Sequence, residues 1–177
     1  SDMVEVTYTN RHRQLGLIQG ENTWFERADI RDLTGKDIWK HIMGLEILKG
    51  KEMPQIDLMI GGPSCQGFSR AGRRDKSDPR NTLFGEYVRV IKEVKPKYIV
   101  LENVEGFIDM QFMGYKGITG IEYPDGSVTP YILRSELREI GYETLEPKIL
   151  NAVDYGVPQR RRRIIFIGYR KGLKAPK

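Results

Sequence analysis

The sequence has one cysteine and two histidines in 177 residues. A single cysteine cannot form a disulfide within the chain, and so few soft ligands argue against a structural zinc site. No apolar run approaches the length of a membrane-spanning helix, and the N-terminus carries no signal-peptide pattern. We therefore expect a reducing, cytoplasmic compartment, with no metal and no membrane among the partners.

Internal repeats and long low-complexity stretches are also absent, and 39% of the residues are hydrophobic. This composition excludes wholesale disorder and suits one domain with a sizeable core. Lysine and arginine outnumber aspartate and glutamate by 29 to 24, which gives a net charge of +5. So modest an excess is compatible with a polyanionic partner and does not establish one.

The spacing of apolar residues predicts the regular elements. We expect strands at Trp24–Ile30, Ile56–Ile60, Tyr98–Leu101, Glu143–Leu150 and Arg163–Tyr169, and helices capped by Asp37, over Leu83–Val94 and over Tyr131–Ile140. Residues 10–22, 67–81 and 109–130 are predicted as loops, and Val4–Tyr8 is too short to assign. The order of strands and helices predicts an α/β fold, a doubly wound, mostly parallel sheet with an antiparallel edge hairpin.

The only cysteine follows a predicted buried strand and a Gly61-Gly62-Pro63 break. Ligands of open α/β sheets bind beyond the carboxyl ends of strands, which is where this loop places Cys65. Gly61 and Gly62 are expected to let the backbone approach a ligand closely. A lone cysteine is more often a buried structural residue, but the glycine-proline break favours a functional thiol here.

A second strand end carries Glu102, directly after Leu101. If the helix between the two strands is a right-handed crossover, Cys65 and Glu102 face one crevice. A nucleophile beside a carboxyl group suits addition to an electron-poor ring. A single glutamate at a strand end is more often a structural ion-pair partner, so the pairing with Cys65 gives this residue its interest.

Four arginines, Arg160 to Arg163, lead into the last predicted strand. Alternation along a strand sends Arg161 and Arg163 to one side and Arg160 and Arg162 to the other. One pair is then expected to reach the crevice. A solvated face, a nuclear-localisation-like patch and a phosphate clamp are the alternatives for such a run.

Four segments resemble motifs of the cytosine-C5 methyltransferase family, in the order of that family. They are the cysteine loop Gly61–Ser69, the helix start Arg80–Tyr87, the segment Glu102–Val104 and the run Gln159–Arg163. Glu-Asn-Val alone would carry no weight, whereas the combination is highly specific. The resemblance implies the Rossmann-like fold of S-adenosylmethionine-dependent methyltransferases and S-adenosyl-L-methionine as cofactor.

The resemblance also implies a mechanism. The target cytosine is flipped out of double-stranded DNA, because its ring is unreachable inside the stack. The Cys65 thiolate adds to C6, while Glu102 holds N3 and the amino group and Arg163 bonds O2. C5 then takes the methyl group of S-adenosylmethionine, and elimination regenerates the thiol.

The remaining site residues are assigned by the same resemblance. Arg161 orders the cysteine loop, Gln159 orders the backbone around it, and Ser69 bonds a DNA phosphate. Pro63 offers its carbonyl to the base. The resemblance further implies contacts of Gln66 and Asn103 with the substrate, and of Asp29, Ile30, Pro63 and Leu83 with the cofactor.

The sequence departs from the family at several points. Ser64 stands where a second proline is more common. No Phe-x-Gly-x-Gly turn precedes Asp29, Glu5 is a poor candidate for the acidic ribose contact, and no target-recognition domain follows Gly168. We therefore expect residues 1–177 to be a partial catalytic domain: a fragment, a split subunit that needs a second chain, or a degenerate remnant. The isolated chain is expected to bind cofactor weakly and to have little or no activity.

The biological setting implied by the resemblance is a bacterial or phage restriction-modification or orphan methylation system, associated with the nucleoid through DNA. An RNA (tRNA) cytosine-C5 methyltransferase and a catalytically silent module that supports a partner subunit are the alternatives. A reactive-cysteine oxidoreductase would need a dinucleotide-binding glycine turn, which the sequence lacks.

Overall fold

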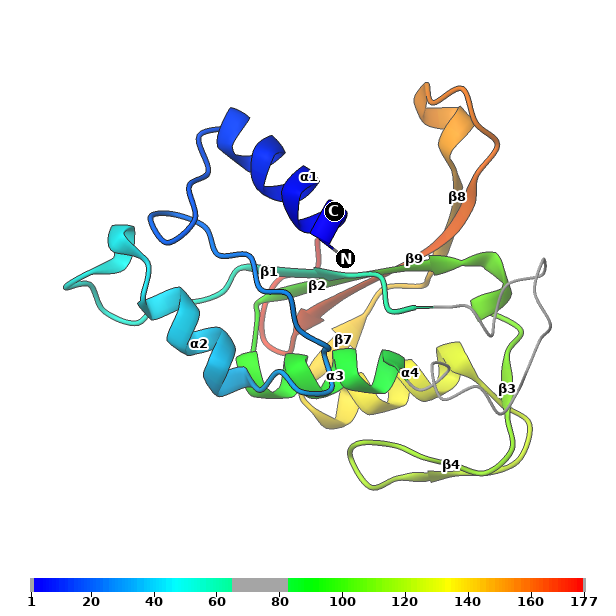
Figure 1. Ribbon diagram of the computed structural model, residues 1–177. Coiled ribbons are helices and arrows are strands. Elements are labelled where there is room, and N and C mark those ends of the chain that lie inside the picture. Colours follow the sequence, from blue (N-terminus) through cyan, green and yellow to red (C-terminus); the bar gives the residue numbers. More distant parts are fainter. Residues whose placement is uncertain (1, 65–82, 177) are drawn as a thin grey trace. The chain divides into compact units, whose positions relative to one another are not determined.

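The computed structural model describes residues 2–64 and 83–176, and the chain divides into two compact units, Ser1–Gln55 and Ile56–Lys177 (Figure 1). The first unit contains α1 (Asp2–Gln14), α2 (Gly35–Met43) and the short helix η1 (Glu46–Leu48). No helix within the described ranges is long and apolar enough to cross a membrane.

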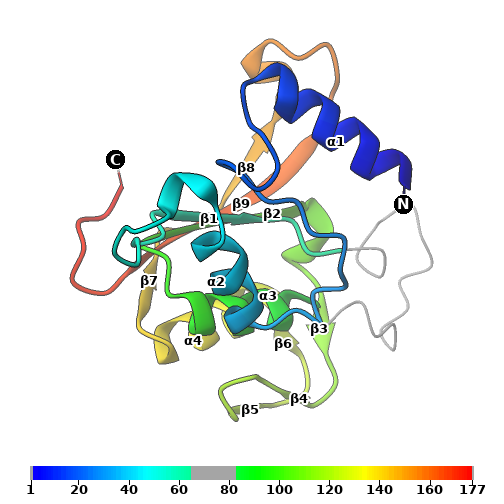
Figure 2. The same ribbon diagram turned by 60° about the vertical axis from the view of Figure 1, so that its left-hand side comes forward.

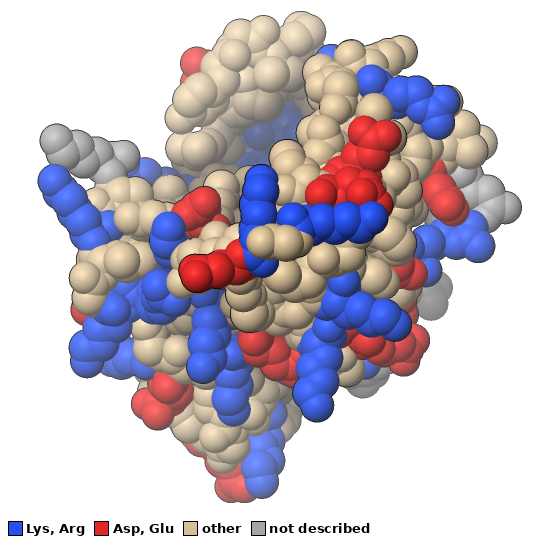
Figure 3. All heavy atoms as spheres, turned by 90° about the vertical axis from the view of Figure 1, so that its left-hand side faces the viewer, with Lys and Arg blue, Asp and Glu red and all other residues tan. Residues whose placement is uncertain are grey.

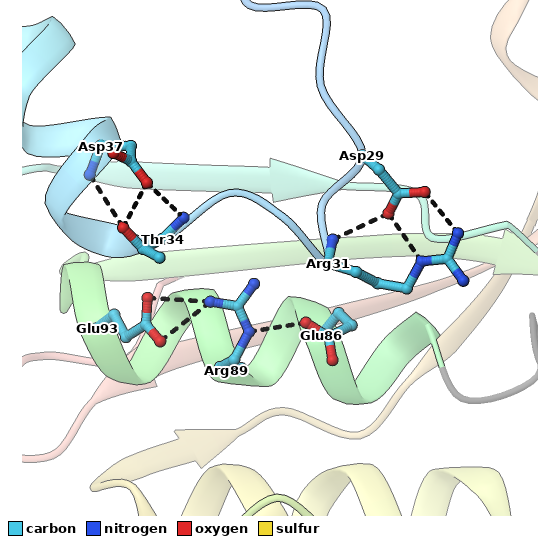
Figure 4. Close-up of polar contacts among 7 residues, drawn as sticks. All are labelled: Asp29, Arg31, Thr34, Asp37, Glu86, Arg89 and Glu93. Carbon is cyan, nitrogen blue, oxygen red and sulfur yellow. Dashed lines mark hydrogen bonds and ion pairs between the residues drawn. The ribbon is translucent and has the colours of Figure 1, made fainter.

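Helix α2 begins with a capping box. Thr34 is the N-cap, its hydroxyl accepts a hydrogen bond from the Asp37 backbone N–H at 3.2 Å, and the Asp37 carboxylate accepts one from the Thr34 N–H at 3.0 Å (Figure 4). The helix was predicted, but the predicted cap was wrong by three residues. Asp37 is the reciprocal partner of the box rather than the cap itself.

Two other predictions in this unit were wrong. Residues 10–14 belong to α1 rather than to a loop. The predicted strand Trp24–Ile30 is not formed; the described residues nearby contain one isolated bridge, between Gln19 and Thr23. Trp24 instead stacks on His41 with 4.5 Å between ring centroids, and its indole N–H donates to Glu26 at 3.0 Å. A strand needs a paired neighbour, which local spacing cannot supply.

The second unit is built on one five-stranded sheet. The strand order is β1 (Leu58–Gly61), β2 (Tyr98–Val104), β9 (Arg162–Arg170) and β7 (Tyr142–Thr144), with β8 (Lys148–Asn151) also paired to β9. β1 and β2 are parallel, and β9 runs antiparallel to β2, β7 and β8. The predicted α/β fold is therefore confirmed. The sheet was expected to be doubly wound and mostly parallel; in the described residues it is mixed, with β1 and β2 as the parallel pair and β7 and β8 both antiparallel to β9.

One predicted strand is divided in two. The expected strand Glu143–Leu150 appears as β7 and β8, which pair with successive parts of β9. Pro147 lies in the gap between them and has no N–H to donate to the ladder.

Helices α3 (Leu83–Val94) and α4 (Thr129–Glu139) pack on the same face of this sheet (Figures 1 and 2). Alternate β2 residues, Ile99 and Leu101, are buried against them. The core continues through Phe84, Tyr87, Val88, Ile91, Phe107, Ile132, Leu133, Leu137, Ile164 and Phe166. The strand–helix–strand path from β1 through α3 to β2 places the carboxyl ends of two parallel strands side by side.

The segment predicted as a loop between β2 and α4 is organised by short ladders. It contains β3 (Gln111–Phe112), β4 (Tyr115–Lys116), β5 (Glu122–Tyr123) and β6 (Ser127–Val128), with β3 paired to β6 and β4 to β5, and the short helix η3 (Glu105–Phe107) precedes it. The remaining short helix, η4 (Ala152–Tyr155), follows β8.

Candidate active site at the ends of two parallel strands

The candidate site lies where β1 and β2 end. Gly61, the last residue of β1, pairs with Leu101 in the parallel register, so Gly62-Pro63 leave the sheet beside Glu102-Asn103, which continue β2 and pair with β9. The Tyr87 hydroxyl, on α3, donates to the carbonyl oxygens of Met59 at 3.1 Å and Val100 at 2.9 Å. Burial raises the pKa of Tyr87 above its ordinary value, so the hydroxyl remains a donor.

Position 61 needs a glycine because helix α3 packs against it, not because a ligand needs the space. A Cβ atom at this position would overlap the Tyr87 ring. The close approach expected at Gly61 is therefore made by Tyr87 of the same chain. Gly62 lies beside the candidate carboxylate, because its Cβ would be 3.4 Å from Oε2 of Glu102.

Asn103 joins the two strand ends. It is buried, with 2% of its surface exposed, and its Nδ2 donates to the Pro63 carbonyl at 3.1 Å. Its Oδ1 accepts from the Val104 N–H at 2.8 Å. The amide thus fixes the backbone that leads from Pro63 towards Cys65. The Pro63 carbonyl, predicted to face a base, retains one lone pair beyond this bond.

Glu102 is paired with Arg163. The distance between Arg163 Nε and Glu102 Oε1 is 2.8 Å, and the two side chains are 23% and 40% exposed. Arg163 also donates through Nη1 to the Arg162 carbonyl at 2.8 Å. The pair therefore presents a fixed carboxylate and a fixed guanidinium at the strand ends, with room for solvent or a ligand.

The other arginines of the run have different surroundings. Arg162 pairs with Glu105 at 3.0 Å. The Arg161 backbone N–H donates to Asn151 Oδ1 at 3.1 Å, while the side chains of Gln159, Arg160 and Arg161 are exposed. Strand β9 begins at Arg162, so the expected alternation of side chains between the two faces of the sheet applies to Arg162 and Arg163, which point to opposite faces. Arg161 and Gln159 precede the strand and do not contact Glu102.

Three of the predicted site residues, Cys65, Gln66 and Ser69, lie outside the described residues. Leu83 is the first residue of α3 and is half-buried. The roles expected from the sequence for these four residues remain predictions.

The first unit carries the other two predicted cofactor residues. Asp29 is exposed and Ile30 is half-buried. Asp29 accepts hydrogen bonds from Arg31 Nε at 2.9 Å, Arg31 Nη2 at 2.6 Å and the Arg31 N–H at 2.9 Å (Figure 4). These side-chain and backbone bonds lower the pKa of Asp29 from 3.8 to about 2, so the carboxylate is ionised at neutral pH.

Sequence reasoning missed two residues that shape this site. Tyr87 was predicted as part of an apolar helix face and of the segment Arg80–Tyr87, with no role for its hydroxyl, although a tyrosine in such a face implies a hydroxyl that needs a partner. No sequence signal marks Glu105 as the partner of Arg162. Within residues 2–64 and 83–176 no group of three or more His, Cys, Asp or Glu residues could hold a metal ion.

Positive charge is also present at the other end of the sheet. Lys95, Lys97 and Arg170 lie together there, because the Arg170 N–H donates to the Lys97 carbonyl at 2.9 Å and Arg170 Nη1 donates to the Lys95 carbonyl at 3.4 Å. Figure 3 shows many lysine and arginine side chains on one face of the molecule, with aspartate and glutamate side chains among them. The basic composition therefore does not single out the candidate site.

Comparisons with known proteins identify relatives. The model of the family C-5 cytosine-specific DNA methylase matches residues 29–177. The Type II methyltransferase M.DdeI of Desulfomicrobium norvegicum is 43% identical over 113 residues, covering 64% of this chain and 24% of that protein. M.XorII of Xanthomonas oryzae pv. oryzae is 40% identical over 146 residues, covering 82% of this chain and 30% of that protein.

A solved structure gives the same result for the fold. The crystal structure of a prophage-encoded E. coli protein, assigned as a DNA modification methyltransferase, superimposes with a TM-score of 0.60 at 28% identity. The match covers 88% of this chain and 36% of that one. The chain thus spans about a quarter to a third of the length of the curated relatives it matches.

Proposed function

This chain belongs to the family of C-5 cytosine-specific DNA methylases, and on that premise we propose that it transfers a methyl group from S-adenosylmethionine to C5 of a cytosine in DNA. The observation that carries the proposal is the Glu102–Arg163 ion pair at the strand ends, beside the Gly62-Pro63 backbone that leads to Cys65. A carboxylate and a guanidinium held at one edge suit recognition of a polar ring.

The proposed chemistry begins with a cytosine extruded from the duplex. The Cys65 thiolate forms a bond to C6, and the ring electrons become available at C5. Glu102 holds N3 and the exocyclic amino group, and Arg163 bonds O2. Bound S-adenosylmethionine would supply the methyl group to C5 and leave as S-adenosylhomocysteine. Loss of the C5 proton to water and cleavage of the bond between Cys65 and C6 would then restore the aromatic ring and the thiolate.

The surrounding residues are proposed as positioning groups. Asn103 was expected to contact the substrate, but its side chain is buried, so we propose instead that it supports the path from Pro63 to Cys65 through its bond to the Pro63 carbonyl. Arg161 and Gln159 are proposed to order the cysteine loop and its backbone, and their exposed side chains are available for this. Gln66 and Ser69 are proposed to contact the substrate, with Ser69 on a phosphate.

S-adenosylmethionine supplies the methyl group as an electrophile when it is bound. The side chains proposed to hold it fit an adenine in chemical type. Ile30 and Leu83 offer half-buried apolar surface for the ring, and Asp29 offers an ionised carboxylate for donors such as an amino group. Pro63 is proposed as a further contact.

Double-stranded DNA is favoured over RNA as the substrate, because the matching family is described as a DNA methylase and the superimposed E. coli protein as a DNA modification methyltransferase. We propose a restriction-modification or orphan methylation setting in the cytoplasm, with nucleoid association through DNA. A tRNA substrate and a silent supporting module are the alternatives.

We also propose that full activity needs polypeptide beyond residues 1–177, in the same protein or a second chain. The sheet supports this: β1 lies at its edge, and Leu58 and Ile60 on that strand are 48% and 68% exposed. Such apolar strand residues are usually covered. The chain alone is expected to bind S-adenosylmethionine weakly; micromolar affinity by calorimetry would contradict this.

The test of the proposed chemistry is covalent trapping. The chain, alone and with the remainder of a relative supplied in trans, is incubated with S-adenosylmethionine and duplex DNA containing 5-fluorocytosine, and its intact mass is measured. An adduct on the wild-type chain that is absent from Cys65→Ser supports the proposal. A tRNA containing the same base tests the RNA alternative. No adduct in any mixture would refute catalysis and leave the silent module.

A further inference from the structure

Helix α4 leads into β7, which pairs with the end of β9 (Figures 1 and 2). A cavity of about 310 Å³ lies among these three elements. Its lining consists of Arg134, Arg138, Tyr142, Glu143, Thr144 and Tyr169. Tyr169 lies six positions beyond Arg163 in β9, which corresponds to about 20 Å of strand. The cavity is therefore separate from the candidate active site.

Two arginines of α4 line this cavity. They are four positions apart, so they lie on the same side of the helix. Arg134 is half-buried, and its Nε donates to the Thr144 hydroxyl at 3.1 Å. The side chain of Arg138 is exposed and forms no hydrogen bond or ion pair with another residue in the described part of the chain. One guanidinium is thus held in position, and the other is open to a ligand.

The walls of the cavity are held by hydrogen bonds. Tyr142 is buried, and its hydroxyl donates to the Pro96 carbonyl at 2.5 Å. Thr144 Oγ1 accepts from Arg134, so the Thr144 hydroxyl keeps its own hydrogen to donate to a ligand. The cavity therefore combines two guanidinium groups with a hydroxyl donor on a fixed frame.

The neighbouring carboxylates do not cancel the positive charge. Glu143 is the one acidic residue in the lining, and it accepts a hydrogen bond from the Tyr169 hydroxyl at 2.7 Å. Glu146 Oε1 lies 2.8 Å from Arg134 Nη1, but the Glu146 side chain is 79% exposed. Exposed ion pairs are weak, so a bound anion can replace Glu146 as the partner of Arg134.

The size and charge of the cavity favour a small phosphate ester. Guanidinium groups bind phosphate oxygens through paired hydrogen bonds. A phosphate monoester carries a charge of about −1.5 to −2 near neutral pH, which matches two arginines on one group. A volume of about 310 Å³ is near the lower end of the range for small-molecule sites, so the group attached to the phosphate must be small.

We propose that the cavity between α4 and β7 binds a small phosphate ester, with its phosphoryl oxygens held by Arg134 and Arg138 and by a hydrogen bond from the Thr144 hydroxyl. On binding, Arg134 exchanges Glu146 for the phosphate. The site goes beyond the proposed methyl transfer and is independent of it, because none of its residues belongs to the candidate active site.

The test is isothermal titration calorimetry of the full chain with glycerol phosphate and with inorganic phosphate, without DNA or S-adenosylmethionine. Arg138→Gln is expected to weaken binding about tenfold, because it removes the open guanidinium. Arg134→Lys keeps the charge but loses the paired donors, so it should weaken binding about fivefold. Glu146→Gln should strengthen binding about threefold, because it removes the competing partner of Arg134.

Arg160→Gln is the matched control. It removes an exposed arginine at the opposite end of the sheet and should leave the affinity for phosphate unchanged. Circular dichroism checks that each variant is folded. Absence of phosphate binding by the wild-type chain would overturn the proposal, as would unchanged affinity in both Arg138→Gln and Arg134→Lys. Equal weakening by Arg160→Gln would also overturn it, because the attraction would then be a general one between an anion and a basic protein.

Two further ligands test the chemical class. Succinate carries its two charges on separate carboxylates and should bind about tenfold more weakly than glycerol phosphate; equal binding would contradict the choice of phosphate. A short DNA duplex tests the other source of phosphate. Competition between the duplex and glycerol phosphate that disappears in Arg138→Gln would show that the cavity takes a nucleic-acid backbone, and would overturn a small ligand.

Discussion

Arg163 and Glu102 form an ion pair, with 2.8 Å between Nε and Oε1, that links β9 to β2 at the end of the sheet. Glu102 lies opposite Ile165 in the ladder, and Arg163 lies opposite Val104. Each charged group is thus held by the other on neighbouring strands. A base that forms hydrogen bonds with both groups must either leave the ion pair intact and use its remaining donors and acceptors, or break it. The positions of Glu102 and Arg163 before a base binds are therefore fixed by the ion pair.

Glu102→Gln tests whether the carboxylate takes part in the chemistry. The amide keeps the shape but cannot stabilise positive charge at N3, so adduct formation with 5-fluorocytosine DNA should slow by about 10²- to 10⁴-fold. Glu105→Gln is the matched control, because Glu105 pairs with Arg162 at the same edge. Equal slowing by both variants, measured by intact mass over time, would contradict a specific role of Glu102.

Gly61→Ala tests the packing between β1 and α3. A methyl group at this position would overlap the Tyr87 ring, so the strand or the helix must move. We expect a loss of about 1 to 3 kcal/mol in the free energy of unfolding, typical of overpacked cores. Urea denaturation measures the loss, and Gly62→Ala, whose nearest contact would be 3.4 Å from Glu102 Oε2, is the milder control. Similar losses for both variants would contradict the packing argument.

Tyr87→Phe tests the hydroxyl separately from the ring. The variant leaves the carbonyl groups of Met59 and Val100 without their shared donor. Because Tyr87 is buried, with 2% of its surface exposed, the expected loss is about 1 to 3 kcal/mol in the free energy of unfolding. Tyr131→Phe is the control, since the Tyr131 side chain is exposed. A neutral Tyr87→Phe would mean that water replaces the hydroxyl.

Much of the second unit was predictable, because its elements follow from local spacing. The apolar face from Leu83 to Val94 has a helical period and stops before Pro96, and α3 has these bounds. The runs that became β2 and β9 are short, branched and apolar, as buried strands are. The family motifs then indicated which strand ends carry the chemistry.

What was not predictable depends on partners distant in sequence. Trp24–Ile30 has a strand-like composition and finds no paired neighbour. Arg162 rather than Arg161 forms an ion pair, because the register of β9 against β2 brings it to Glu105. Gly61 has its role because of a tyrosine 26 positions away along the chain. Each of these outcomes is decided by tertiary packing, which overrides local preference.

The Asp29–Arg31 contact predicts an acid-range titration. The pKa of Asp29 is lowered from 3.8 to about 2, principally by its side-chain hydrogen bonds with Arg31. A depressed pKa favours the folded chain above the ordinary value of 3.8, and this contribution is lost as the pH falls towards about 2. NMR titration of the Asp29 carboxyl should show the low value, and Arg31→Gln should return it towards 3.8. An unchanged titration in Arg31→Gln would contradict the assignment.

Glu136 provides the last prediction, because its carboxylate is buried in the core of α4 with 1% of its surface exposed. It accepts hydrogen bonds from the Thr119 N–H at 3.0 Å, the Thr119 hydroxyl at 2.6 Å and the Tyr123 hydroxyl at 2.8 Å. It therefore fastens the turn between β4 and β5 to the helix. A Cβ at Gly117 would overlap this carboxylate, which explains a glycine in the same turn.

Glu136→Gln replaces one acceptor oxygen by an amide NH₂ that faces donors. We expect it to lower the free energy of unfolding by about 2 to 4 kcal/mol, because hydrogen bonds to a charged group are strong and a buried donor is left unpaired. Thr119→Val removes one of the three bonds and should cost about half as much. Glu139→Gln, at an exposed position of the same helix, should be neutral. Urea denaturation of the three variants decides the point: a neutral Glu136→Gln would contradict the role given to these hydrogen bonds.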